Sequence, residues 1–164
     1  MASTIKVNEI QHTGGTTALT IDSSGRIAKP NMVAFQSNRT AGAVTAGNIY
    51  VCNNATLNKG NAYNTSTGKF TCPVDGVYAF YCSILSANNA IANDLQLYKN
   101  STTSSNLLMR SRVDNGGDTD SYASVNLHYT HEFSAGDTIY LHVTAGSFFG
   151  TDYSWTQFGG RLIG

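Results

Sequence analysis

Residues 61–80 of this chain read NAYNTSTGKFTCPVDGVYAF. A short extended run ends at Pro73, which has no backbone N–H to donate. Asp75 and Gly76 have the composition of a two-residue turn with left-handed backbone angles. An alternating apolar run then begins at Val77. The stretch therefore predicts a strand, a tight hairpin turn and a second strand.

The regions around this stretch continue the alternation. In residues 77–85 both sets of alternating side chains are fairly apolar, which predicts an interior strand between layers or beside a subunit interface. In residues 123–133 one set is apolar and the other polar, as in a half-buried antiparallel strand. Residues 33–35, 49–52 and 139–143 predict further strands. Roughly eight to ten short strands without helical periodicity indicate an all-β protein built as a two-sheet sandwich.

The charge balance argues against several kinds of partner. The chain has 164 residues, with ten basic and ten acidic side chains that cancel. Such a surface does not attract phosphate backbones or anionic membranes, so we expect no nucleic-acid partner. We also expect no membrane insertion, because no apolar run approaches the length of a membrane span. The first residues lack the basic start and apolar stretch of a secretory signal, which predicts a protein made in a cytosol.

The stretch at residues 61–80 resembles the signature of the complement component 1q globular head, a jelly roll related to the tumour necrosis factor fold. The Gly-Asp turn at residues 136–137 and the closing run FGGRLI at residues 158–163 resemble further elements of that family. The resemblance spans most of residues 31–164 and implies a jelly-roll β-sandwich that forms a homotrimer. Composition alone leaves an immunoglobulin-like sandwich or a partly open barrel as alternatives. The resemblance also places Tyr63 close to the trimer centre. Tyr78 and Phe80, on the apolar run at residues 77–85, are expected at the trimer interface with it.

Residues 1–30 differ from the rest of the chain. Their apolar residues occur in isolated alternating pairs between turn-rich segments, too few to form a core. This extended arm must therefore be disordered, pack on its own head, or pair with another chain. The residues expected to anchor it to another chain are Ile5, Val7, Ile10, Leu19 and Ile21.

The arm resembles the leader of many tail-fibre and other virion proteins of marine and cyanobacterial bacteriophages. The resemblance rests on STIKVNEIQ (residues 3–11), TGGT (13–16) and LTIDSSGRI (19–27). It implies a protein of the virion surface, made in the host cytoplasm, whose arm (1–30) attaches to other virion proteins. Its head (31–164) would contact a host surface glycan or protein. Capsid decoration, by a head fibre or cement protein that stabilises the shell, is an alternative, and a hydrolase that trims host polysaccharide is a further one.

Catalytic motifs are missing, so we expect a non-enzymatic protein without a cofactor. The sequence contains no G-x-S-x-G elbow, phosphate-binding loop or H-E-x-x-H pair. One loop suits a calcium ion, because it holds three carboxylates among flexible residues, and a solvated turn is the alternative. Those carboxylates belong to Asp114, Asp118 and Asp120. A zinc site would need His128 and His142 on the same face of neighbouring strands.

Three cysteines, Cys52, Cys72 and Cys82, have neither a metal-binding spacing nor an even number for disulfides. They are predicted to be small buried hydrophobic residues.

Four aromatic residues lie beside turns or on the polar side of strands, where they fit either an interface or ligand site or the edge of the core. They are Tyr63, Tyr140, Tyr153 and Trp155.

Overall fold

The computed structural model of the chain describes residues 5–87, 92–114, 116 and 122–164. These residues divide into two compact units, which meet between Met32 and Val33. The described residues contain β-strands and two 3₁₀ turns, η1 (Ser104–Asn106) and η2 (Tyr153–Trp155), but no α-helix. No helix long and apolar enough to cross a membrane occurs in this part of the chain. The prediction of an all-β protein is confirmed.

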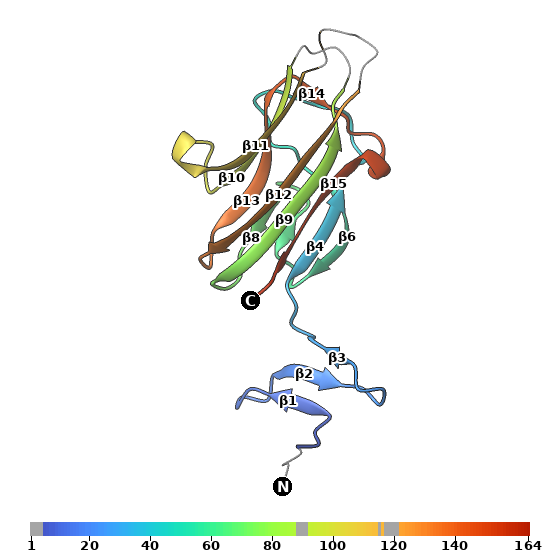
Figure 1. Cartoon of the computed structure of the whole chain (residues 1–164), viewed down its shortest axis with the longest axis vertical. Coiled ribbons are helices and arrows are strands. Elements are labelled where there is room, and N and C mark those ends of the chain that lie inside the picture. The colour runs from blue at the N-terminus through green and yellow to red at the C-terminus, as the bar shows by residue number, and fades with distance from the viewer. Residues whose placement is uncertain (1–4, 88–91, 115, 117–121) are drawn as a thin grey trace. The chain divides into compact units, whose positions relative to one another are not determined.

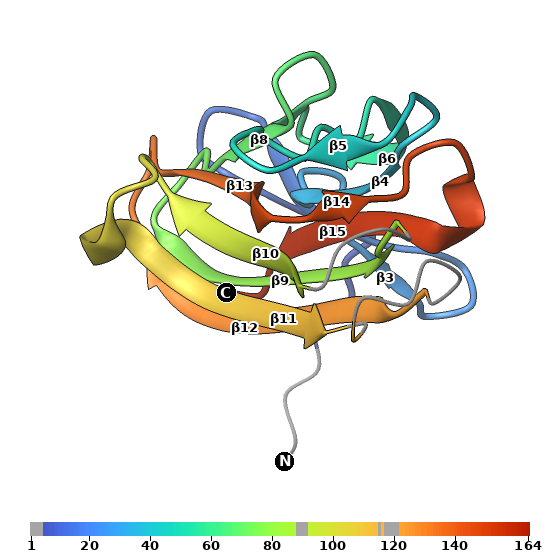
Figure 2. The ribbon, with the colours of Figure 1, turned by 90° about the horizontal axis from the view of Figure 1, so that it is seen from above.

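The larger unit, the head, is a sandwich of two five-stranded antiparallel sheets (Figures 1 and 2). The β9 sheet has the order β12 (Ser124–Phe133), β9 (Gly76–Leu85), β15 (Thr156–Leu162), β4 (Ala34–Asn38) and β6 (Asn54–Lys59). The β10 sheet has the order β11 (Leu107–Asp114), β10 (Ala92–Lys99), β13 (Thr138–Ala145), β8 (Lys69–Thr71) and β7 (Tyr63–Asn64). A short pair, β5 (Val44–Thr45) with β14 (Ser147–Phe148), forms a separate ladder. The closing strand β15 is the middle strand of its sheet.

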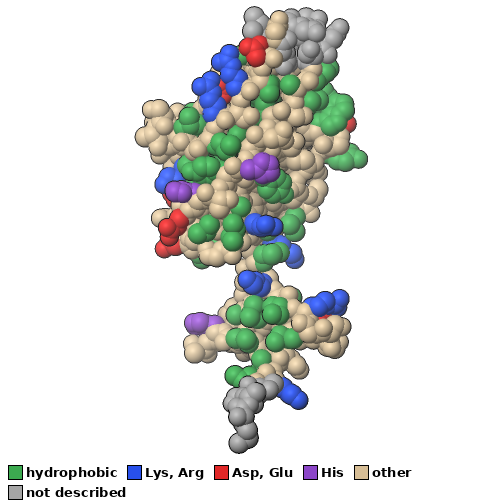
Figure 3. All heavy atoms as spheres, in the orientation of Figure 1, with side chains coloured by type: hydrophobic (Ala, Val, Ile, Leu, Met, Phe, Trp, Pro, Cys, Tyr) green, Lys and Arg blue, Asp and Glu red, His purple; other side chains and the backbone are tan. Residues whose placement is uncertain are grey.

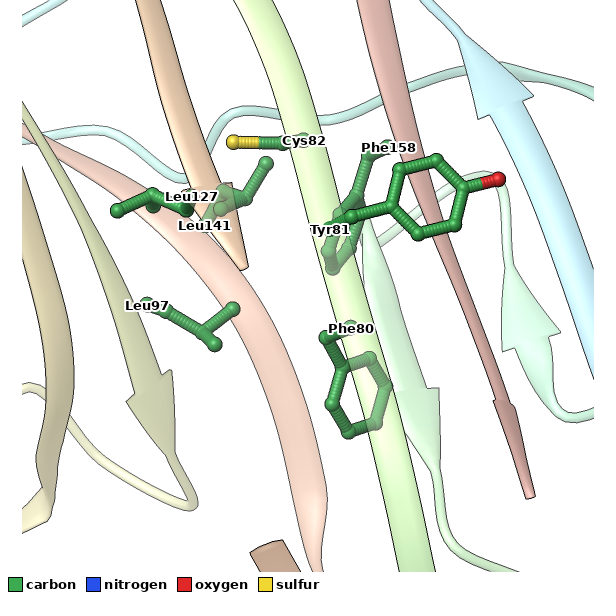
Figure 4. A pocket seen from close by; sticks show the side chains of 7 residues that line it. All are labelled: Phe80, Tyr81, Cys82, Leu97, Leu127, Leu141 and Phe158. Carbon is green, nitrogen blue, oxygen red and sulfur yellow. The ribbon is translucent and has the colours of Figure 1, made fainter. Parts of the chain in front are cut away.

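The core lies between the two sheets and contains many aromatic rings. The ring of Phe35 stacks on that of Tyr63 at 4.5 Å between centroids and on that of Phe70 at 5.1 Å. Figure 4 shows a neighbouring region, where Leu97 and Leu141 come from one sheet and Phe80, Cys82, Leu127 and Phe158 from the other. The packing there leaves no room even for a water molecule. This close packing makes the head a single hydrophobic core without an internal ligand cavity at that place.

The predicted hairpin at Asp75 and Gly76 is wrong. Strands β8 and β9 belong to different sheets, so the chain crosses between layers after Cys72. Gly76 has no left-handed backbone angle; it is the first residue of β9 and pairs with Phe133. A side chain there would come within 2.8 Å of the Gly164 carbonyl oxygen, so glycine permits close approach of the C-terminus.

The tight hairpin of this region lies earlier, between β7 and β8. Tyr63 pairs with Phe70, and Asn64 pairs with Lys69. Gly68 supplies the left-handed angle, with a φ of 71°, and its N–H donates to the Asn64 carbonyl oxygen at 2.8 Å. The turn therefore joins two strands of the same sheet.

The smaller unit is a three-stranded antiparallel sheet, formed by β1 (Glu9–Gln11), β2 (Thr17–Ile21) and β3 (Ile27–Ala28). In the turn between β2 and β3, the Asp22 carboxylate accepts bonds of 2.9 Å from the N–H groups of Ser24 and Arg26. Gly25 in that turn has a φ of 77°. The short extended pieces predicted from the sequence therefore pair with one another.

All three cysteines are free and buried, as predicted. Burial raises the pKa of the Cys52 and Cys72 thiols to about 12, and it also raises the pKa of Cys82. The thiolate is the reactive form, so these groups are protected both by burial and by protonation.

We expect none of the three thiols to react with a water-soluble disulfide reagent in the folded protein at about pH 8, because each stays protonated and covered. Unfolding in guanidinium chloride should expose all three. The absorbance of the released thiol measures both stages. A thiol that reacts rapidly before denaturant is added would contradict the burial of the cysteines.

Candidate functional site

The side of the β9 sheet that is turned away from the core carries an exposed mixture of apolar, aromatic and polar groups. Alternation along β9 buries Tyr78 and Phe80 and leaves Val77 and Tyr81 with 37% and 39% of their surface exposed. The neighbouring strands add exposed polar and charged groups. We name the surface formed by Val77, Ala79, Tyr81, His128, Thr130 and Arg161 the β9 face (Figure 3).

A glycine on β15 shapes the β9 face. A side chain at Gly159 would come within 2.5 Å of the Tyr81 ring, so this ring can lie across the strand only because glycine is there. The Tyr81 hydroxyl donates to the Gln36 side chain, whose amide donates to Gln157. The His128 ring stacks on the Tyr81 ring at 6.4 Å with an angle of 18°. These contacts hold an aromatic surface flat and rigid without covering it.

A shallow groove of about 220 Å³ runs along this face. Ala79, Tyr81, His128, Thr130 and Arg161 line it. Its lining residues include one cation, Arg161, and no carboxylate. The mixed apolar and aromatic character of this groove fits contact with another protein surface.

The three residues predicted at a trimer interface are covered within a single chain. Tyr63, Tyr78 and Phe80 are at most 2% exposed in a single chain. Tyr63 also donates its hydroxyl to the Cys52 carbonyl oxygen at 3.0 Å inside the protomer. Side chains that are covered within one subunit leave almost no surface for a second one. A subunit contact on this sheet must therefore use the side chains of β9 that point away from the core, those of Val77, Ala79 and Tyr81.

The carboxylate loop is described only in part. Asp114 ends β11 as an exposed residue, and its carboxylate accepts the N–H of Gly116 at 3.0 Å. Asp118 and Asp120 lie outside the described residues, so the calcium site stays a prediction. Among the residues that are described, no three His, Cys, Asp or Glu side chains form a group that could hold a metal ion.

The zinc site considered for His128 and His142 does not fit the fold. His128 is on β12 in the β9 sheet, whereas His142 is on β13 in the β10 sheet. The two strands are consecutive in the sequence, but the turn between them passes from one layer to the other.

Two of the four singled-out aromatic residues are exposed. Tyr153 and Trp155 are on η2 and have 66% and 49% of their surface exposed. Tyr140 is buried, and the Lys69 ammonium lies 4.8 Å from its ring centroid. The Trp155 ring also contacts the Phe149 ring, with centroids 5.2 Å apart. The loop end of the head therefore presents an aromatic pair, which we call the η2 pair, Tyr153 and Trp155.

The η2 turn is held by local hydrogen bonds. The Asp152 carboxylate accepts the Ser154 N–H at 2.8 Å and the Ser154 hydroxyl at 2.6 Å. The Gln157 amide donates to the Tyr153 carbonyl oxygen at 2.6 Å. Because the backbone is fixed in this way, the exposed rings lose little freedom when they bind a partner.

The two stacked five-stranded sheets, the central closing strand and the open β9 face define a jelly-roll sandwich of the tumour necrosis factor type. The model of the C1q domain matches residues 34–163, and the chain belongs to this family. Domains of these families form homotrimers that bind ligands or build structures.

Three proteins that are similar to this chain come from animals. Caprin-2 of Danio rerio is 28% identical over 106 residues, which are 65% of this chain but only 11% of that protein. The globular domain of zebrafish complement 1qA is 20% identical, with a TM-score of 0.65, covering 81% of this chain and 98% of that one. Eiger TNF from S. frugiperda is 16% identical, with a TM-score of 0.68, covering 82% and 94%. At these identities the structures establish the jelly-roll fold alone.

Proposed function

We propose that this chain is a non-enzymatic surface protein of a bacteriophage virion. It forms a homotrimer through the β9 face, attaches to other virion proteins through the smaller unit, and contacts a host surface glycan or protein with the loop end of its head. The observation that carries this proposal is the open β9 face of a domain whose family forms homotrimers. The leader-like sequence of the smaller unit supports its place in a virion.

The chemistry of the β9 face supports self-association. A twofold or threefold arrangement of copies would cover Val77, Ala79 and the Tyr81 ring, which removes apolar area from water. The residues of this face carry a single cation, Arg161, and Glu132 lies farther along β12 opposite Val77. A surface with so few charges loses little solvation when it is buried.

The η2 pair supports a binding role for the other end of the head. The chain enters the head at Val33, next to the start of β4, whereas η2 precedes the far end of the β15–β4 ladder, where Gln157 pairs with Asn38. Within the head, η2 therefore lies at the opposite end of this ladder from Val33. Flat rings with a polar handle suit sugar rings or a protein surface, and three copies would add avidity.

Removing both rings of the η2 pair tests this role. Purified protein should compete with phage for binding to host cells. We expect the double variant Tyr153→Ala, Trp155→Ala to need at least about a tenfold higher concentration than the unaltered protein to block adsorption, because exposed aromatic anchors carry much of a binding energy. Adsorption is measured as free phage remaining after incubation of cells with purified protein. The matched control is Val74→Ala, an exposed apolar residue in the crossover between β8 and β9, which should block as well as the unaltered protein. Equal blocking by the double variant would contradict the role of the η2 pair.

Capsid decoration is the competing function. Gold-labelled antibody against the head should mark the tail of intact virions if the protein serves adsorption, and the shell if it serves decoration. The hydrolase alternative predicts sugar fragments when the protein is incubated with host polysaccharide. Release of fragments would overturn the non-enzymatic proposal.

A further inference from the structure

The small sheet of residues 5–32 has one apolar face and one polar face. Ile10 lies directly opposite Leu19, and Ile21 lies directly opposite Ile27. Directly paired residues in an antiparallel ladder point to the same side, and alternation along β2 places Leu19 and Ile21 on that side together. We name this surface, formed by Ile10, Leu19, Ile21 and Ile27, the arm face.

The opposite side of the sheet has a different composition. Glu9 pairs with Thr20, and Thr20 pairs with Ala28. Glu9 is the one charged residue within β1, β2 and β3, so the arm face contains no charged strand residue. The sheet is therefore amphipathic, as a sheet is when one of its faces is packed against something.

The arm face is open to solvent in the single chain. Ile10 and Ile27 have 47% and 63% of their surface exposed, and Leu19 and Ile21 are only partly covered. Figure 3 shows hydrophobic side chains gathered on this unit. Three strands with a hydrophobic face are about the least that a sheet needs for independent stability, and covering that face removes apolar area from water. We therefore expect a partner surface to cover the arm face.

The short connection to the head favours other copies of the same chain as the partner of the arm face. Strand β3 ends at Ala28 and β4 begins at Ala34, so only residues 29–33 join the small sheet to the head. The head enters directly into β4, which belongs to the β9 sheet. In the trimer proposed above, three small sheets would thus start from the sheet that forms the subunit contact. Such short tethers hold the arm faces at a high effective concentration, which favours their association.

We infer that the arm faces of three copies pack against one another and form a second hydrophobic core, separate from that of the heads. This inference rests on the proposed trimer. The edges of the small sheets, with their unpaired backbone groups, and the exposed Ile5 and Val7 remain to bind the virion partner. Trimerisation and attachment then use different surfaces of the same unit.

Cysteine cross-linking in the full chain tests this packing. Ile27→Cys places a thiol on the arm face, and Ala28→Cys places one on the opposite face at the adjacent position. The three natural thiols are buried and do not compete. With a short bismaleimide, each maleimide ring adds one thiol, and a covalent dimer appears on a denaturing gel. We expect at least about fivefold more dimer from Ile27→Cys than from Ala28→Cys, since only the first thiols are held close together.

A second matched pair, Ile10→Cys and Glu9→Cys, repeats the comparison on β1 and guards against a variant that fails to fold. Equal yields within both pairs would overturn the inference. The mass of the unaltered chain, measured by light scattering, separates the two proposals. A trimer with equal yields contradicts only the packing of the arm faces, whereas a mass of one chain, 17.5 kDa, contradicts the trimer as well.

Discussion

Replacement of Gly160 by alanine is expected to destabilise the head by about 3 kcal/mol, because the added methyl group has no space in a close-packed core. It would lie 2.5 Å from Phe80 Cδ1 and 2.9 Å from Phe35 Cε1, and both rings are enclosed by other aromatic rings. Neither ring can move away without displacing its neighbours. Urea unfolding followed by circular dichroism measures the loss.

Gly42→Ala is the matched control for this prediction. A side chain at Gly42 would meet no atom within 4 Å, and its backbone angle is not left-handed. We expect its free energy of unfolding to change by less than about 0.5 kcal/mol. A Gly160→Ala protein as stable as the control would show that the two sheets do not pack as described.

Replacement of Ala79 by arginine is expected to convert the trimer to single chains. Ala79 lines the groove of the β9 face and pairs directly with Arg161 on β15. A long charged side chain would fill the groove, place a second cation beside Arg161, and bring like charges from different copies together at a buried contact. Light scattering should show the mass falling from that of three chains to 17.5 kDa.

The control for Ala79→Arg is Thr71→Arg, on an exposed position of β8 in the other sheet. It adds the same side chain away from the β9 face, so the trimer should remain. Each variant should keep a cooperative melt, since a like-charge pair across strands costs a protomer only about 1 kcal/mol. A trimeric Ala79→Arg protein would exclude the β9 face as the subunit contact.

The strands with clear alternation were predictable, and those without it were not. Alternation in residues 123–133 corresponds to β12, where Val125 and Leu127 are buried. Strand β6 was missed because its sequence, NATLNK, is almost entirely polar and lies at the edge of a sheet. The apolar run at residues 49–52 makes one isolated bridge, from Ile49 to His142, instead of a strand. The run is apolar although it is not a strand, since Tyr50 and Cys52 are buried in the core.

The candidate sites were harder to predict. Tyr63, Tyr78 and Phe80 were predicted at an interface and are buried, whereas the residues of β9 that face outward are the neighbours of the last two in the chain. The signal that could have identified the β9 face was present in residues 77–85, where both parities are apolar. The exposure of Tyr153 and Trp155 had no signal in the sequence, because their neighbours in the chain do not indicate whether η2 is covered.

The amino-acid sequence alone indicated that the chain is all-β, which side chains alternate along the long strands, that turns occur around Gly25 and Gly136, and that the cysteines are buried. These properties depend on neighbours within a few residues. Only the tertiary structure decided that β8 and β9 belong to different sheets, that the arm pieces pair with one another, and which parity of β9 faces outward. Those outcomes depend on pairing between segments far apart in the chain, and local composition carries no information about such pairing.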